Sequence, residues 1–179
     1  MAAITLHTDT YSLPSVKVIA HKKSHRVAVL CDQGEPKSLA VTIFPVRKSA
    51  ILAMPDRDIR LGGLMGKTFR AHGFAVDQNR LLLVRRPLPH YICKRLDVPQ
   101  GSKGYVEVYE FFAGPHCYGI VIEYVKDTAV LPPRPARGSR FVRCIPGQWL
   151  RLAITEALAY AYLKRSLYYA LHYSGTLDA

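Results

Sequence analysis

Four charged residues between positions 94 and 123 have the types and spacing to bind an anion and a metal ion. Lys94 and Arg95 are adjacent cations, and Glu107 and Glu123 lie in segments that resemble strands. A glutamate inside a closed sheet requires a cation or a metal ion, because an unpaired buried carboxylate is costly. We therefore expect Glu107 and Glu123 to bind a divalent ion. The alternative is that both form salt bridges at exposed strand ends.

Two further cations, Arg85 and Arg86, end an apolar run that precedes this region. On a neighbouring strand they could pair with the glutamates or add positive charge to the same site. The sequence thus predicts a ligand-binding set of Lys94, Arg95, Arg85 and Arg86 for a polyanion such as a triphosphate, a nucleotide or a nucleic acid.

Alternating and β-branched segments predict an antiparallel sheet that would position these charges. The expected strands are Ser15–Ala20, Arg26–Cys31, Ser38–Pro45, Arg80–Arg86, Ile92–Val98, Tyr105–Phe112 and Tyr118–Val125. Short helices are expected at Val46–Met54, ending before Pro55, and near Leu61–Phe69, with a charged loop at Asp56–Arg60. The predicted fold class is α+β, with a curved or closed, largely antiparallel sheet that is tunnel-like or barrel-like.

The chain is expected to contain a sheet domain, residues 1–146, followed by a long C-terminal helix within residues 147–179. Residues 131–143 are rich in arginine and proline and form the end of the sheet domain. The last segment has an apolar face at helical spacing and is free of proline after residue 147. We expect this helix to pack on the domain or on a partner, including a second copy of the chain.

Composition favours an anionic partner. The chain has 179 residues and a net charge of +12, which attracts polyanions. No apolar run has the ~18 residues of a membrane span, and the N-terminus lacks the features of a signal peptide. We therefore expect a cytoplasmic protein without a transmembrane segment. The four cysteines form no CxxC motif, so we interpret them as incidental or buried thiols.

The region from about residue 90 to 140 resembles the second half of CYTH, or triphosphate tunnel, proteins. The residues that carry this resemblance are Ile92, Lys94, Arg95, Val98, Pro99, Glu107, Phe111, Gly114, Gly119, Glu123, Pro132 and Pro133. The resemblance implies an antiparallel tunnel in which Lys94 and Arg95 contact phosphate. It also implies that Glu107 and Glu123 are catalytic residues that bind Mg²⁺ or Mn²⁺. The family's Glu-x-Glu-x-Lys strand is absent before residue 60, so we expect binding rather than hydrolysis.

The hairpin region 26–46 is similar to the chorismate lyase and UTRA ligand-binding fold. Its matching residues are Arg26, Gly34, Glu35, Pro36, Ala40, Thr42, Pro45 and Val46. This second resemblance implies that Arg26 pairs with a substrate carboxylate and that Glu110 is the catalytic acid. Val41 stands where the lyases place a second arginine.

Two main functions therefore remain open from the sequence. The leading hypothesis is a basic CYTH-like domain that binds a phosphate-rich ligand, with a triphosphatase-like phosphohydrolase as its enzyme form. The alternative is a chorismate-lyase-like enzyme or a sensor of small aromatic acids. An assembly protein whose basic surface and apolar helix contact partners is a third class.

Overall fold

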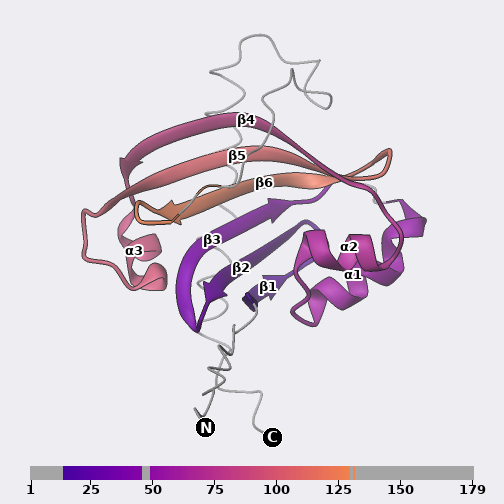
Figure 1. Ribbon diagram of the computed structural model, residues 1–179, viewed down its shortest axis with the longest axis horizontal. Coiled ribbons are helices and arrows are strands. Elements are labelled where there is room, and N and C mark those ends of the chain that lie inside the picture. Colours follow the sequence, from indigo (N-terminus) through magenta and orange to yellow (C-terminus); the bar gives the residue numbers. More distant parts are fainter. Residues whose placement is uncertain (1–13, 46–48, 130, 132–179) are drawn as a thin grey trace, which may run out of the picture.

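The computed structural model describes residues 14–45, 49–129 and 131, and these form a curved antiparallel sheet with short helices (Figure 1). The six strands lie in the order β1-β2-β3-β6-β5-β4. Their bounds are β1 Ser15–His21, β2 His25–Asp32, β3 Glu35–Ile43, β4 Val76–Pro87, β5 Lys103–Ala113 and β6 His116–Lys126. The α+β class and the antiparallel sheet are confirmed.

The sheet is open, so the prediction of a closed tunnel or barrel is wrong. β1 and β4 lie at opposite ends of the strand order, and they do not pair with each other within the described residues. The central contact is between β3 and β6, which joins the hairpins of the first and second halves of the chain. Strong twist and curvature give the sheet two distinct faces without closing it (Figure 1).

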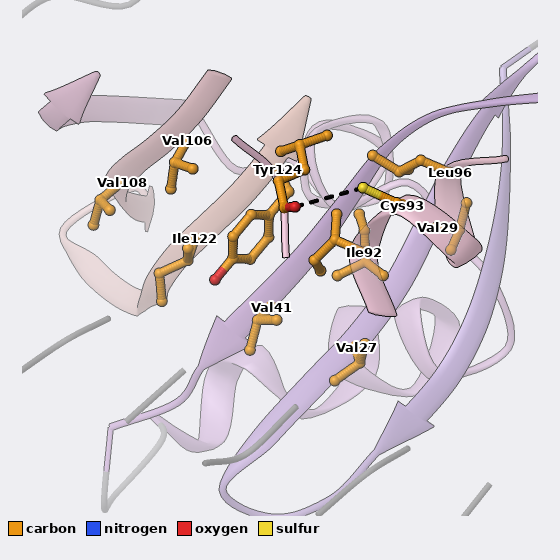
Figure 2. Packing of buried hydrophobic residues seen from close by; sticks show 12 residues of the cluster. Val27, Val29, Val41, Ile92, Cys93, Leu96, Val106, Val108, Ile122 and Tyr124 are labelled. Carbon is orange, nitrogen blue, oxygen red and sulfur yellow. Dashed lines mark hydrogen bonds between the residues drawn. The ribbon is translucent and has the colours of Figure 1, made fainter. Parts of the chain in front are cut away.

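One face of the sheet is covered by α3 and is called the α3 face here. Helix α3, His90–Leu96, buries Ile92, Cys93 and Leu96. Figure 2 shows these side chains against apolar residues of the strands, among them Val27, Val29, Val41 and Tyr124. Full burial of an aliphatic side chain contributes about 1.5–3 kcal/mol, so this contact holds α3 firmly on the sheet.

The expected strand Ile92–Val98 is therefore wrong. The buried positions 92, 93 and 96 follow helical spacing, whereas a strand would bury alternate residues. Asp97 ends the helix with a left-handed backbone at φ +53°. Lys94 and Arg95 consequently project from a helix and not from a sheet.

The opposite face, called the α1–α2 face, is covered by η1, Ala50–Leu52, α1, Ala53–Arg60, and α2, Met65–Ala71. Its core includes Ile59 and Phe69 from the helices and Phe111 and Val121 from the sheet. The expected helix at Val46–Met54 is confirmed over residues 50–54, whereas its end before Pro55 and the charged loop at Asp56–Arg60 are wrong, and residues 46–48 lie outside the described residues. Pro55 lies in the first turn of α1, where its missing N–H costs no helical hydrogen bond. The helix near Leu61–Phe69 corresponds to α2.

A β-bulge interrupts the pairing of β5 with β6. Phe111 pairs with Gly119 and Phe112 pairs with Cys117, so Tyr118 is an extra residue on β6. Such an extra residue bends the strand and redirects its side chain. Tyr118 is fully buried and its ring contacts Phe69 of α2. The predicted C-terminal helix and the segment 131–143 lie outside the described residues, except for Leu131.

Candidate functional site

The four predicted phosphate-binding cations do not converge on Glu107 and Glu123. Lys94 and Arg95 lie on α3, whereas Glu107 belongs to the set of β5 residues on the α1–α2 face. Arg85 is exposed at the end of β4, where its Nε donates to Asp127 Oδ1 at 2.8 Å. This contact raises the pKa of Arg85 and lowers that of Asp127. The arrangement is a surface salt bridge and not part of a shared cavity.

Arg86 pairs with Gly104 at the same end of the sheet, one residue before the end of β4. It lies in the strand predicted for it, but no pocket described in the structure includes it. Its predicted role in binding a ligand stays a prediction.

Glu107 and Glu123 lie directly opposite each other on β5 and β6, as Cα partners. Arg80 Nε is 2.6 Å from Glu107 Oε1. Ser38 Oγ donates to Glu123 Oε1 at 2.6 Å, and the Tyr109 hydroxyl donates to Glu123 Oε2 at 3.2 Å. Both buried carboxylates thus have partners inside the protein, as burial requires. They are structural members of the α1–α2 face.

The predicted Mg²⁺ or Mn²⁺ ligands Glu107 and Glu123 do not fit a divalent ion well. No group of three or more His, Cys, Asp or Glu side chains that could hold a metal occurs in residues 14–45, 49–129 and 131. Magnesium needs about six oxygen ligands, and these two carboxylates already accept hydrogen bonds from side chains. This geometry gives no support to metal binding or catalysis at this pair, and both stay predictions.

Arg26 and Glu110, the pair implied by the lyase resemblance, lie on opposite faces of the sheet. Glu110 has the strand parity of Val106 and Val108, which pack on the α3 face. It is fully buried and accepts a hydrogen bond from Asn79 Nδ2 at 2.8 Å. The pair thus does not form one acid–cation site.

Arg26 is a buried cation on the α1–α2 face, with 3% of the residue exposed. Its Nη2 donates to the carbonyl oxygen of Gly63 at 3.3 Å, and its Nε has no hydrogen-bond acceptor among the described residues. Burial lowers the pKa of Arg26, and the neighbouring Tyr118, Asp56 and Tyr109 oppose this shift. Arginine nevertheless stays charged in proteins. The loop at Gly63 therefore accepts a hydrogen bond from a buried positive charge.

Asp56 joins α1 to the sheet beside Arg26. Its carboxylate accepts a hydrogen bond from the Tyr118 hydroxyl at 2.7 Å and one from Arg60 Nε at 3.3 Å. His21 Nε2 of β1 lies 3.5 Å from the same carboxylate. Burial and the contact with Asp56 raise the pKa of Tyr118 above its ordinary value. Tyr118 therefore stays protonated and remains a donor at neutral pH.

A groove of about 550 Å³ lies between the start of β1 and the helices α1 and α2. One wall contains the polar residues Asp58, Lys67, Thr68 and His72, and Asp58 Oδ2 is 2.7 Å from His72 Nε2. The remaining lining is largely apolar and comprises Pro14, Val16, Leu61, Leu64 and Ala71, together with Ser15, Gly62 and Gly63. Its volume is in the usual range of small-molecule sites, about 300–1,000 Å³.

The loop between α1 and α2 forms part of this groove and requires glycine at two positions. Gly62 has φ +103°, a conformation that other residues rarely adopt. A Cβ on Gly63 would lie 2.5 Å from Thr68 Oγ1 and 2.9 Å from the carbonyl oxygen of Asp58. Because Arg26 binds the carbonyl of Gly63, this loop connects the buried cation with the groove.

Sequence reasoning identified Arg26 but missed its surroundings. The sequence predicts a charged loop for Asp56 and a turn for Gly63, whereas both residues contact the surroundings of Arg26. The four-residue spacing of Asp56 and Arg60 is typical of a helical ion pair and could have indicated α1. Nothing in the sequence indicated that Tyr118 would meet Asp56 from 62 positions away.

No protein-family model matches the chain, and no curated protein matches its sequence. Several solved structures do match its fold. The Staphylococcus aureus gene product SA0254 is 8% identical, with a TM-score of 0.53, over 69% of this chain and 90% of that chain. YydK of Bacillus subtilis, described as a possible transcriptional regulator, is 9% identical, with a TM-score of 0.54, over 69% and 64% respectively.

A third match is the C-terminal domain of the histidine utilization repressor from Pseudomonas syringae, at 11% identity and a TM-score of 0.49. It covers 69% of this chain and 99% of that chain. Of these matches, YydK is described as a possible transcriptional regulator and the Pseudomonas protein as a repressor. At these identities the likeness establishes the fold alone.

The prediction of a CYTH-like triphosphate tunnel is therefore wrong, and with it the prediction of phosphate and nucleotide binding that rested on the tunnel. The sheet is open, and the structures that share its fold are not tunnel proteins. The second resemblance, drawn from the hairpin around Gly34, gave the correct fold. Within the described residues, no helix is long and apolar enough to cross a membrane.

Proposed function

We propose that this chain is a small-molecule sensor domain and that the groove beside α1 and α2 receives its ligand. The observation that carries the proposal is the contact between the buried guanidinium of Arg26 and the carbonyl of Gly63, a residue that lines the groove. Burial of a charge is costly, and a strongly perturbed charged group beside a cleft is a candidate for a functional role. The fold shared with the possible regulator YydK supports a sensing role.

The lining of the groove favours a small aromatic acid as the ligand. Leu61, Leu64 and Val16 offer apolar surface for a ring, while Lys67 and Thr68 offer a cation and a hydroxyl for a carboxylate. Charge-assisted hydrogen bonds to a carboxylate are about twice as strong as neutral ones. Arg26 acts from behind the loop, because its hydrogen bond fixes the direction of the Gly63 carbonyl.

The proposal does not include chorismate lyase activity. That reaction would require Arg26 and Glu110 at one substrate, and their side chains project from opposite faces of the sheet. Ligand binding in the groove requires no contribution from Glu110.

Calorimetric titration with 4-hydroxybenzoate, and with its uncharged amide as a matched control, tests this function. We expect the acid to bind and the amide to bind at least about tenfold more weakly, a difference of about 1.4 kcal/mol. Lys67→Met should remove most of this preference, because the cation in the groove is lost. Lys94→Met removes an exposed lysine from α3, on the other face, and should leave the affinity unchanged.

Two results would refute this proposal. One is the absence of binding by 4-hydroxybenzoate and by a panel of other aromatic acids of similar size. The other is equal loss of binding in Lys67→Met and Lys94→Met, which would indicate a non-specific response to net charge. Arg26→Ala with preserved folding and unchanged affinity would refute the role of Arg26 alone.

A further inference from the structure

The outer side of α1 carries a row of exposed apolar side chains. Among the described residues, four large apolar side chains are exposed, and three of them lie on or directly after η1 and α1. These are Ile51, Met54 and Leu61, with exposed fractions of 59%, 66% and 81%. Their spacings of three and seven residues place them on one side of a helix. We call these three residues the α1 stripe.

Cations flank the α1 stripe. Arg57 and Arg60 are exposed on α1, and the side chain of Arg60 remains 51% exposed while it contacts Asp56. Asp58 is the exposed acid beside the stripe, and it already pairs with His72. The stripe therefore has two exposed cations beside it and one acid that is already paired, in a chain of net charge +12.

We propose that the α1 stripe is a docking surface for an acidic, amphipathic helical segment of another protein. Apolar side chains of the partner would cover Ile51, Met54 and Leu61, and its carboxylates would pair with Arg57 and Arg60. An apolar centre with a charged rim is the usual composition of such interfaces. A second copy of this chain fits poorly, because it would bring the same cations together. The proposal stands without the small-molecule function.

The chemistry of the stripe favours a protein over a membrane surface. Asp58 lies four residues after Met54 and three before Leu61, on the same side of α1, and its side chain is 51% exposed. Insertion of the stripe into a bilayer would remove this carboxylate from water, which is costly. A protein partner can leave Asp58 hydrated or supply a donor to it.

The test uses two fluorescent synthetic helices of about 18 residues, long enough for about five turns. Both have leucine at positions i, i+3, i+4 and i+7, and the other positions are mainly glutamate in one and lysine in the other. Fluorescence anisotropy should detect binding of the glutamate peptide only. Met54→Glu should weaken that binding at least about tenfold, since it places a carboxylate against the leucines of an acidic peptide. Arg57→Glu should weaken it and permit binding of the lysine peptide.

Leu83→Glu is the matched control, because Leu83 is the fourth exposed apolar residue and lies on β4. It should change the affinity by no more than about twofold, which is within ordinary surface effects. All three substitutions are at exposed positions, and melting curves that match the wild type verify the fold.

Several outcomes would overturn the proposal. These include no binding of the glutamate peptide, equal binding of both peptides, and an equal effect of Met54→Glu and Leu83→Glu. A dimer in sedimentation velocity that Met54→Glu abolishes would assign the stripe to a second copy instead. Sedimentation with phosphatidylserine-containing vesicles that Met54→Glu abolishes would assign it to a membrane surface.

Discussion

At the scale of single residues, the buried face beside α1 depends on matched hydrogen bonds around one carboxylate. Asp56 receives donors from Tyr118 and Arg60 and lies near His21. Arg26 is close enough to influence the pKa of Tyr118, which burial and Asp56 raise. The cluster thus balances charge within the α1–α2 face, and the loss of one member should weaken the hydrogen bonds of the others.

Tyr118→Phe tests this balance. The substitution keeps the aromatic packing and removes the donor 2.7 Å from Asp56, so a buried carboxylate loses a partner. We expect the free energy of unfolding to fall by about 1–3 kcal/mol, measured by urea denaturation. Tyr105→Phe on β5 is the control and should change it by less than about 0.5 kcal/mol. Equal effects of the two substitutions would contradict the assigned role of Asp56.

The predicted strand around Arg26 is confirmed, whereas the role of Arg26 in binding a substrate carboxylate stays a prediction. An arginine within an apolar strand indicates a buried or functional cation, because burial of an unpaired charge is costly. The partners of Glu107 and Glu123 could not be predicted from the sequence. Arg80 and Ser38 meet them through strand pairing between distant segments, and pairing depends on a strand order that local patterns do not contain.

At the scale of elements, the helices α1 and α2 are held together as one unit by the short loop that joins them. Leu61 N, Gly62 N and Gly63 N all donate to carbonyls of α1, and Asp58 contacts His72 after α2. The unit provides one wall of the groove and carries the α1 stripe. Its geometry therefore affects both proposed surfaces.

A pair of glycine substitutions tests the rigidity of this unit. Gly63→Ala would place a Cβ against the carbonyl oxygen of Asp58, and we expect a loss of about 1–3 kcal/mol in stability. Gly66→Ala lies in α2, where the added Cβ has no neighbour closer than 3.7 Å. It should stabilise the fold by up to about 1 kcal/mol, because alanine favours helix. Thermal unfolding of both variants measures the difference, and the same sign for both would contradict the described loop.

The elements differ in how well the sequence predicted them. Strands β1 to β6 follow runs of β-branched and aromatic residues, and six of the seven expected strands were correct within a few residues. The seventh, Ile92–Val98, is the helix α3, because its apolar residues fit either period over so short a segment. Its assignment was decided by tertiary burial of Ile92 and Leu96 on the sheet, which local sequence does not show.

At the scale of the whole molecule, stability should be highest at the centre of the strand order. β6 pairs with β3 on one side and with β5 on the other, whereas β1 pairs with β2 alone within the described residues. Hydrogen exchange measured by NMR should therefore be slowest in residues 120–124 of β6. Amides 15–20 of β1 should exchange at least about tenfold faster. Equal protection would indicate that another segment pairs with the outer edge of β1.

Whole-molecule architecture was predictable only in part. Antiparallel pairing follows from the short turns, such as the two-residue turn at Gln33 and Gly34, because hairpins of this length join antiparallel neighbours. Whether such a sheet closes depends on the twist, the strand order and what covers its faces. A tunnel and an open sheet therefore produce nearly the same local patterns, which explains the incorrect prediction of a closed sheet.

The bulge at Tyr118 has a consequence for how this chain can vary over evolutionary time. Deletion of one residue between His116 and Tyr118 would give β5 and β6 an uninterrupted register, a change that favours regular pairing. It would also place Tyr118 opposite Phe112, on the α3 face, so that its hydroxyl no longer reaches Asp56. The irregular register is thus needed for the hydrogen bond between Tyr118 and α1. An insertion or deletion in this hairpin would therefore be tolerated only together with a compensating change in α1.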